Sequence, residues 1–130
     1  MKLADSSFLV GLIEEDDFHH EAAVAIFDEV SASGHGPIVV DDSVLLETLQ
    51  VMERRHGVLR SQAATTLARV CSMQEFRIDP AALQALRAVA GRPALGFVDA
   101  LLAEQDLCSG SGILSFDRTL LVHMERLRTR

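Results

Sequence analysis

The chain has 130 residues, which is enough for one packed core and too few for two ordinary domains, so we expect a single domain over residues 1–130. Apolar residues make up 48% of the sequence and charged residues 24%, a balance that excludes a disordered chain and a fibrous repeat. The net charge of -7 argues against nucleic-acid binding through a broad basic surface. It does not exclude a nucleic-acid enzyme, because bound divalent cations reverse the sign of a local acidic cluster.

The chain shows no targeting or membrane segment. Only a short apolar stretch separates Lys2 from Asp5, which leaves no room for a signal peptide, and no apolar run approaches the about 20 residues of a membrane helix. Two isolated cysteines, Cys71 and Cys108, do not form a disulfide framework or a zinc motif, and we expect both to be buried. These features predict a cytoplasmic protein without a membrane partner.

The first half of the chain alternates short apolar segments with stretches of helical periodicity. In chain order it predicts a strand over 2–4, a helix over 6–13, a charged and solvated turn over 14–17, a helix over 18–32, a strand over 38–40 and a helix from about 41 to 56. Asp5 or Ser6 can cap the first of these helices, and Gly57 ends the last.

The second half continues the same alternation. It predicts a helix over 59–72, a strand over 75–78, a helix that begins at Asp79-Pro80, a helix over 97–107, a strand over 113–116 and a helix over 118–127. Strands that alternate with helices pair in parallel through right-handed crossovers. The predicted fold is therefore α/β: a three-layer α/β/α sandwich with a central, mainly parallel sheet.

Four acidic residues stand out in this arrangement. Asp5 and Asp117 each follow a predicted strand, and the carboxyl ends of parallel strands meet at one edge of a sheet. Glu47 and Asp99 lie among apolar neighbours in predicted helices, where an unpaired carboxylate is costly to bury and a cation would offset that cost. Clustered oxygen ligands without Cys or His favour Mg²⁺ or Mn²⁺ over zinc. Such a site can hydrolyse a phosphodiester bond.

Each acid also has a simpler interpretation. Any of the three aspartates can be a helix N-cap, since Asp is a preferred capping residue. Capping does not explain Glu47 in the middle of a helix, although Glu47 could pair with a buried Arg or face solvent. The four residues taken together favour the metal site.

The segments that hold these acids resemble the successive motifs of PIN-domain ribonucleases, and residues 15–23 resemble the entrance to the second helix of VapC-type toxins. The four motif segments are 3–10, 44–47, 97–102 and 113–118. The resemblance implies an endoribonuclease dependent on Mg²⁺ or Mn²⁺, with Asp5, Glu47, Asp99 and Asp117 as catalytic metal ligands. Ser7 and Ser115 match hydroxyl positions that orient ligands or water.

The resemblance also implies a homodimer that a small antitoxin protein neutralises, as in a toxin–antitoxin pair. One departure concerns the C-terminus: such domains usually continue to a final edge strand, whereas this chain ends in a basic, helix-like segment over 123–130. Two other functions compete. A non-catalytic interaction module could keep the same fold, and a receiver-like phospho-acceptor domain is disfavoured because Lys2, the only lysine, precedes the first acid.

Overall fold

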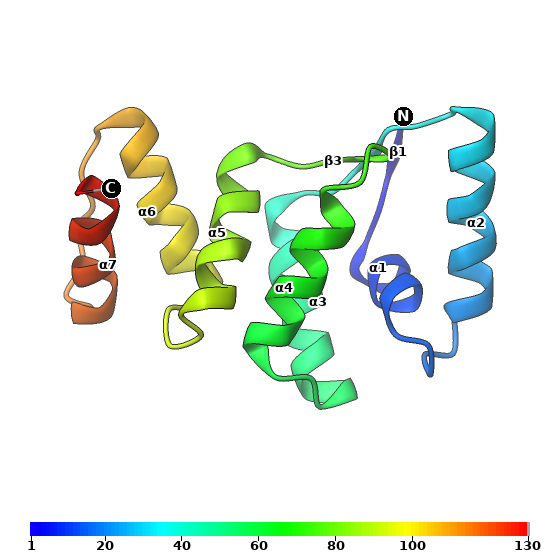
Figure 1. Cartoon of the computed structure of the whole chain (residues 1–130), viewed down its shortest axis with the longest axis horizontal. Coiled ribbons are helices and arrows are strands. Elements are labelled where there is room, and N and C mark those ends of the chain that lie inside the picture. Colours follow the sequence, from blue (N-terminus) through cyan, green and yellow to red (C-terminus); the bar gives the residue numbers. More distant parts are fainter. Residues whose placement is uncertain (130) are drawn as a thin grey trace.

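A computed structural model describes residues 1–129 of the chain (Figure 1). Its elements in chain order are β1 (Lys2–Leu3), α1 (Ser6–Ile13), α2 (His20–Ser33), β2 (Ile38–Val39), α3 (Asp42–His56), α4 (Arg60–Cys71), β3 (Phe76–Arg77), α5 (Pro80–Gly91), α6 (Phe97–Ser109) and α7 (Arg118–Arg128). All the predicted helices are therefore present within two residues of their expected bounds. Arg130, the last residue of the predicted basic segment, lies outside the described residues.

The sheet has three parallel strands in the order β1-β2-β3. Lys2 is in register with Ile38, and Ile38 with Phe76. The backbone N–H of Lys2 donates to the carbonyl of Pro37, and that of Val40 to the carbonyl of Arg77. The predicted α/β fold with a parallel central sheet is confirmed, although its strands are shorter than expected.

The helices carry most of the packing. Figure 1 shows them side by side along the long axis of the molecule, from α2 at one end to α7 at the other, and each packs against its neighbours in the order α2, α1, α3, α4, α5, α6, α7. The main core lies between α1 and the start of α6 and is built largely from aliphatic side chains, among them Leu9, Leu45, Leu67 and Leu86. This packing fixes α1 against α3.

Side-chain caps set the starts of several helices. Aspartates accept a backbone N–H bond at the starts of α1, α3, α5 and α7, where the residues are Asp5, Asp41, Asp79 and Asp117. At the end of α3, Gly57 takes the left-handed conformation with φ of 65°, which glycine adopts without steric cost. The capping role predicted for the aspartates is thus confirmed for Asp5 and Asp117.

The predicted strand over 113–116 is wrong. This segment is not paired with the sheet, and the side chains of Leu114 and Phe116 are fully exposed. The reason is that Asp106 near the end of α6 accepts the backbone N–H of Gly112, which ties the start of the segment to α6. Cys108, expected to be buried, is also exposed at this end of the molecule.

The last two helices form a small unit with its own apolar cluster, made of Ala103, Leu120, Met124 and Leu127. The carboxylate of Asp106 is buried and also accepts from Arg128 Nη2 at 3.1 Å. Asp106 therefore connects the end of α6, the extended segment and the end of α7. A contact of 3.4 Å between Arg92 Nη1 and His123 Nδ1 joins this unit to the end of α5.

We predict that Asp106→Ala lowers the free energy of unfolding by about 1.5–3 kcal/mol, because it removes two hydrogen bonds to a buried carboxylate. Urea denaturation measures this change. The matched control is Asp28→Ala, since Asp28 is exposed on α2. An unchanged urea midpoint for Asp106→Ala would contradict the role given to this residue.

Candidate functional site

A cleft of about 590 Å³ lies between α1, the loop that follows it, and α3. Two kinds of charged side chain line it. Glu47 and Asp17 contribute carboxylates, while Arg54 and Arg55, at the end of α3, contribute guanidinium groups. A space that presents both carboxylates and guanidiniums can hold a cation and the phosphate groups that accompany it.

Asp5 adjoins this cleft through Ser7, which lines it. The carboxylate of Asp5 accepts the Ser7 hydroxyl at 2.7 Å and the backbone N–H of Phe8 at 3.1 Å. These bonds, that of Ser7 first, hold the pKa of Asp5 below its ordinary value. Asp5 is therefore fully ionised at neutral pH and ready to bind a cation.

Glu47 reaches the same place from α3. The hydroxyl of buried Ser6 donates to Oε1 of Glu47, which connects the first turn of α1 to the middle of α3. Since Ser6 is the neighbour of both Asp5 and Ser7, two adjacent serines hold the two acids at one end of α1. The sequence identified Ser7 and treated Ser6 only as a possible cap.

The expected burial of Glu47 is wrong, because its side chain is exposed. The buried residues of α3 follow a helical stripe that Glu47 does not share: Leu45, Thr48, Leu49 and Met52. The spacing of this stripe is visible in the sequence and places Glu47 beside it, toward the cleft.

Asp99 and Asp117 form a second group of acids. Asp99 lies in the first turn of α6 and lines another cavity with Leu46 and Gln50 of α3. Partial burial, followed by the nearby charge of Asp117, raises the pKa of Asp99. Asp117 caps α7 by accepting the N–H of Leu120 at 3.1 Å.

Ser115 supports this second group at its backbone. Its hydroxyl oxygen accepts the N–H of Asp117 at 3.0 Å. Ser115 thus orients the main chain of Asp117, whereas Ser7 bonds directly to the carboxylate of Asp5.

The structure places the four predicted ligands along α1, α3, α6 and the start of α7. Glu47 lines the cleft between α1 and α3, Asp5 lines a cavity beside β1, Asp99 lines a cavity beside the start of α6, and Gln50 lines the cavities of both Glu47 and Asp99. Among residues 1–129, no three of these four carboxylates bring an oxygen from each within 4.8 Å of one another. Carboxylate oxygens suit a hard cation in their donor chemistry.

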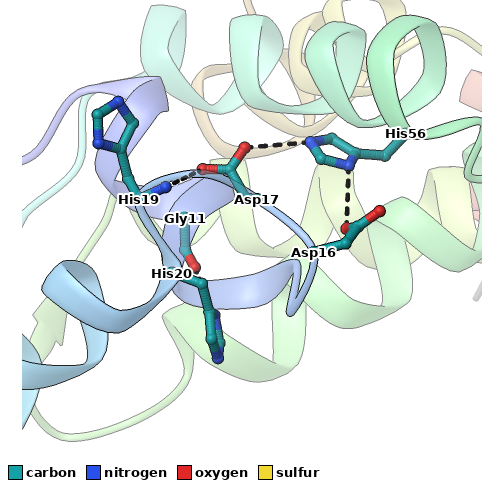
Figure 2. A network of polar contacts seen from close by, with 6 residues as sticks. All are labelled: Gly11, Asp16, Asp17, His19, His20 and His56. Carbon is teal, nitrogen blue, oxygen red and sulfur yellow. Dashed lines mark hydrogen bonds and ion pairs between the residues drawn. The ribbon is translucent and has the colours of Figure 1, made fainter.

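Within the described part of the chain, one group brings three potential metal-ligand atoms within 4.8 Å of one another. It consists of the carboxylates of Glu14 and Asp16 and the imidazole of His56. His56 Nδ1 lies 3.3 Å from Asp16, and its Nε2 lies 3.2 Å from Asp17 (Figure 2). The imidazole is buried, at 8% exposure, whereas Asp16 is open to solvent. This group is a possible acidic metal-binding cluster beside the cleft.

The network around His56 also fixes the loop between α1 and α2. Asp17 accepts the backbone N–H of His19 at 3.0 Å, and His20 Nδ1 lies 2.7 Å from the carbonyl of Gly11 (Figure 2). The bond from His19, followed by the contact with His56, lowers the pKa of Asp17. The predicted solvated turn over 14–17 is confirmed for Glu15 and Asp16, which are exposed, but not for Asp17, whose side chain is covered and contacts His56, a residue far away in the sequence.

The profile of the PIN domain matches residues 2–126 of the sequence. The chain belongs to the PIN-domain family. PIN domains are typically metal-dependent nucleases and usually bind a divalent metal, which agrees with the carboxylates at this cleft. No curated protein gives a significant match to the sequence. None of the helices within residues 1–129 has both the length and the apolar character that a membrane span needs.

We predict that Asp17→Ala lowers the free energy of unfolding by about 1.5–3 kcal/mol at neutral pH, since hydrogen bonds to a charged group are lost. The pKa of Asp17 lies below its ordinary value of 3.8, so the carboxylate stabilises the fold above that pH and this contribution is lost as the pH falls through the lower, folded value. The difference between variant and wild type should therefore disappear in acid.

Unfolding curves measured from pH 7 to pH 2 test this dependence. Glu15→Ala, a change at the exposed neighbouring acid, is the control. A difference that stays constant down to pH 2 would show that the charge of Asp17 does not hold the loop.

Proposed function

We propose that this PIN-domain protein is an endoribonuclease that cleaves RNA phosphodiester bonds and acts in the cytoplasm as the toxin of a toxin–antitoxin pair. The observation that carries the proposal is the Glu47 carboxylate, bonded to Ser6, in a cleft that also exposes arginines, together with the bond from the neighbouring Ser7 to Asp5. The family match supports the nuclease chemistry.

The arginines of the cleft explain how an acidic protein can bind RNA. Arg54 and Arg55 are exposed and line the same space as Glu47, although the chain as a whole carries a net charge of -7. A planar guanidinium donates two parallel hydrogen bonds to phosphate, so these side chains can position the RNA backbone beside the carboxylates. Phosphate binding by this cleft is thus local and does not need a basic surface.

The proposed metal is Mg²⁺ or Mn²⁺, because carboxylate oxygens select hard cations. Its proposed ligands are Asp5, Glu47, Asp99 and Asp117. Ser7 and Ser115 act as positioning residues, the first on the carboxylate of Asp5 and the second on the backbone of Asp117.

The proposed partners follow from the toxin assignment. They are an RNA substrate, a second copy of the chain in a homodimer, and a small antitoxin protein that blocks the cleft. The resemblance of residues 15–23 to the entrance to the second helix of VapC-type toxins supports them.

We predict that Asp5→Asn and Glu47→Gln each reduce RNA cleavage by about 100-fold or more, since each removes the negative charge that would face the metal. EDTA should stop cleavage by the wild type, and excess Mn²⁺ or Mg²⁺ should restore it. Cleavage of total cellular RNA, followed by mapping of the cut sites, measures both effects.

Asp79→Asn is the matched control, because Asp79 caps α5 as Asp5 caps α1, and asparagine is also a good cap. It should leave cleavage unchanged. Full activity of Asp5→Asn would contradict the nuclease site, and cleavage that persists in EDTA would contradict the metal.

We also predict that Arg54→Ala and Arg55→Ala raise KM for RNA and weaken its dependence on salt, because each removes one phosphate contact. Steady-state cleavage at several salt concentrations measures this change. Arg69→Ala, at an exposed residue of α4 outside the cleft, is the control. Equal effects of the three substitutions would show that the cleft does not bind the RNA backbone.

A second candidate is a non-catalytic interaction module with the PIN fold, which is favoured by the finding that, among residues 1–129, no three of the four acids bring oxygens within 4.8 Å of one another. This module would bind a protein partner without metal. Calorimetric titration separates the two functions: heat of Mn²⁺ binding that Asp5→Asn removes supports the nuclease, and no binding at millimolar Mn²⁺ supports the module.

A further inference from the structure

Phe18 is exposed in the loop between α1 and α2, at the edge of the cleft. Its side chain is 93% exposed, and the residues on either side of it, Asp17 and His19, both line the cleft. The nearest phenylalanines along the chain, Phe8 and Phe27, are instead partly buried against the main core. An aromatic ring left open to solvent beside a cleft can contact a ligand that the cleft holds.

The loop that carries Phe18 is anchored on both sides of it. On one side, Asp17 contacts His56 of α3 at 3.2 Å. On the other side, His20 Nδ1 lies 2.7 Å from a main-chain carbonyl oxygen of α1 (Figure 2). The loop therefore presents Phe18 in a fixed position, and a ligand that binds the ring pays little entropy for ordering the chain.

His19 packs against Phe18. The two ring centroids are 5.0 Å apart and the ring planes lie at 90°, an edge-to-face contact that orients the phenyl ring and still leaves it almost wholly exposed. His19 stands at the N-cap of α2, but its ring makes no capping hydrogen bond. Figure 2 shows this ring turned away from the contact between Asp17 and His56. Phe18 and His19 thus form an open aromatic pair beside the cleft.

The charges around the aromatic pair distinguish a phosphate side of the cleft from a base side. Arg54 and Arg55 line the cleft from α3 and are exposed. The loop is acidic, with Glu15 and Asp16 exposed just before Phe18. Arginines attract phosphate and the acids repel it, whereas the face of a base carries no net charge and stacks on an aromatic ring. The backbone of a bound RNA therefore lies toward α3, with a base toward the loop.

We propose that Phe18, oriented by His19, stacks against an unpaired base of the RNA bound in the cleft. Glu47 and Arg54 are seven residues apart, so they lie about two turns apart along α3, with a rise of about 10 Å between them. The stacked base consequently belongs to a nucleotide next to the one that is cleaved, and Phe18 is a positioning residue. The inference rests on the proposed function, because it takes RNA as the ligand of the cleft.

A single exposed ring favours a base over a protein surface as the partner of Phe18. Protein partners cover contiguous apolar patches, in which several large apolar side chains meet. The neighbours of Phe18 in the loop are instead charged or polar, namely Asp16, Asp17, His19 and His20. Stacking needs only one open ring face, which Phe18 provides.

Binding to RNA with and without bases tests the stacking without any measure of cleavage. The two probes are a short single-stranded RNA of mixed sequence and an abasic ribose-phosphate oligomer of the same length. Fluorescence anisotropy in EDTA, which keeps the RNA intact, gives their dissociation constants. Phe18→Ala should weaken binding of the RNA roughly 5- to 100-fold and leave binding of the abasic oligomer unchanged, since only the RNA has bases to stack.

Two further substitutions serve as references for Phe18→Ala. Arg54→Ala should weaken binding of both probes, because both carry the phosphates that this side chain binds. Leu107→Ala, at an exposed apolar residue of α6 outside the cleft, is the control and should change neither. The urea midpoint of Phe18→Ala should equal that of the wild type, because the side chain is exposed.

Replacements of the ring separate stacking from a general apolar contact. Phe18→Trp should keep the affinity for RNA, since it retains a flat aromatic face, whereas Phe18→Leu should lose as much as Phe18→Ala. Full affinity of Phe18→Leu would overturn the stacking. Unchanged RNA binding by Phe18→Ala, or an equal loss on the RNA and on the abasic oligomer, would overturn it as well.

Cleavage assays separate this inference from the proposed nuclease. If Phe18→Ala loses affinity only for the RNA with bases but the wild type does not cleave RNA, the nuclease is overturned and the stacking stands. If the wild type cleaves RNA and Phe18→Ala binds it as the wild type does, the stacking is overturned and the nuclease stands. A wild type that binds neither probe overturns RNA as the ligand of the cleft, and the stacking with it.

Discussion

The hydrogen bonds that Asp5 accepts at the start of α1 set the geometry on which the candidate site depends. They end β1, start the helix and keep the carboxylate ionised, all within four residues. Ser6, in the next position, then bonds to Glu47 and fixes α1 against α3. Asp5 caps α1 through Oδ1, which leaves its other carboxylate oxygen available, so capping and metal binding are compatible roles for the same residue.

Charge in this protein is organised locally. The chain is acidic overall, yet arginines at the end of α3 line the same cleft as Glu47 and Asp17. The loop between α1 and α2 closes one side of the cleft. The contact between Asp17 in this loop and His56 at the end of α3 holds it in place. The binding surface therefore depends on the packing of α3 against its neighbours as much as on the acids.

The C-terminal unit holds the last of the four acids, Asp117, at the start of α7. A carboxylate that follows a strand reaches the sheet edge only when its strand belongs to the sheet. β1 does, and residues 113–116 of the same chain do not, because Asp106 and the apolar cluster of α6 and α7 hold them elsewhere. Asp117 lies near Asp99, whose pKa is raised by partial burial and then by the charge of Asp117.

The sequence by itself determined the helices, the parallel α/β class and the caps at Asp5 and Asp117, because periodicity and capping are local properties of the chain. The burial expected for Glu47 from its apolar neighbours was wrong, because the buried stripe of α3 runs through Leu45, Thr48, Leu49 and Met52 and leaves Glu47 exposed. Only the tertiary structure decided the bond between Ser6 and Glu47, the position of His56 and the absence of residues 113–116 from the sheet. Each of these depends on contacts between distant segments, and an apolar strand sequence does not specify which edge it will pair with.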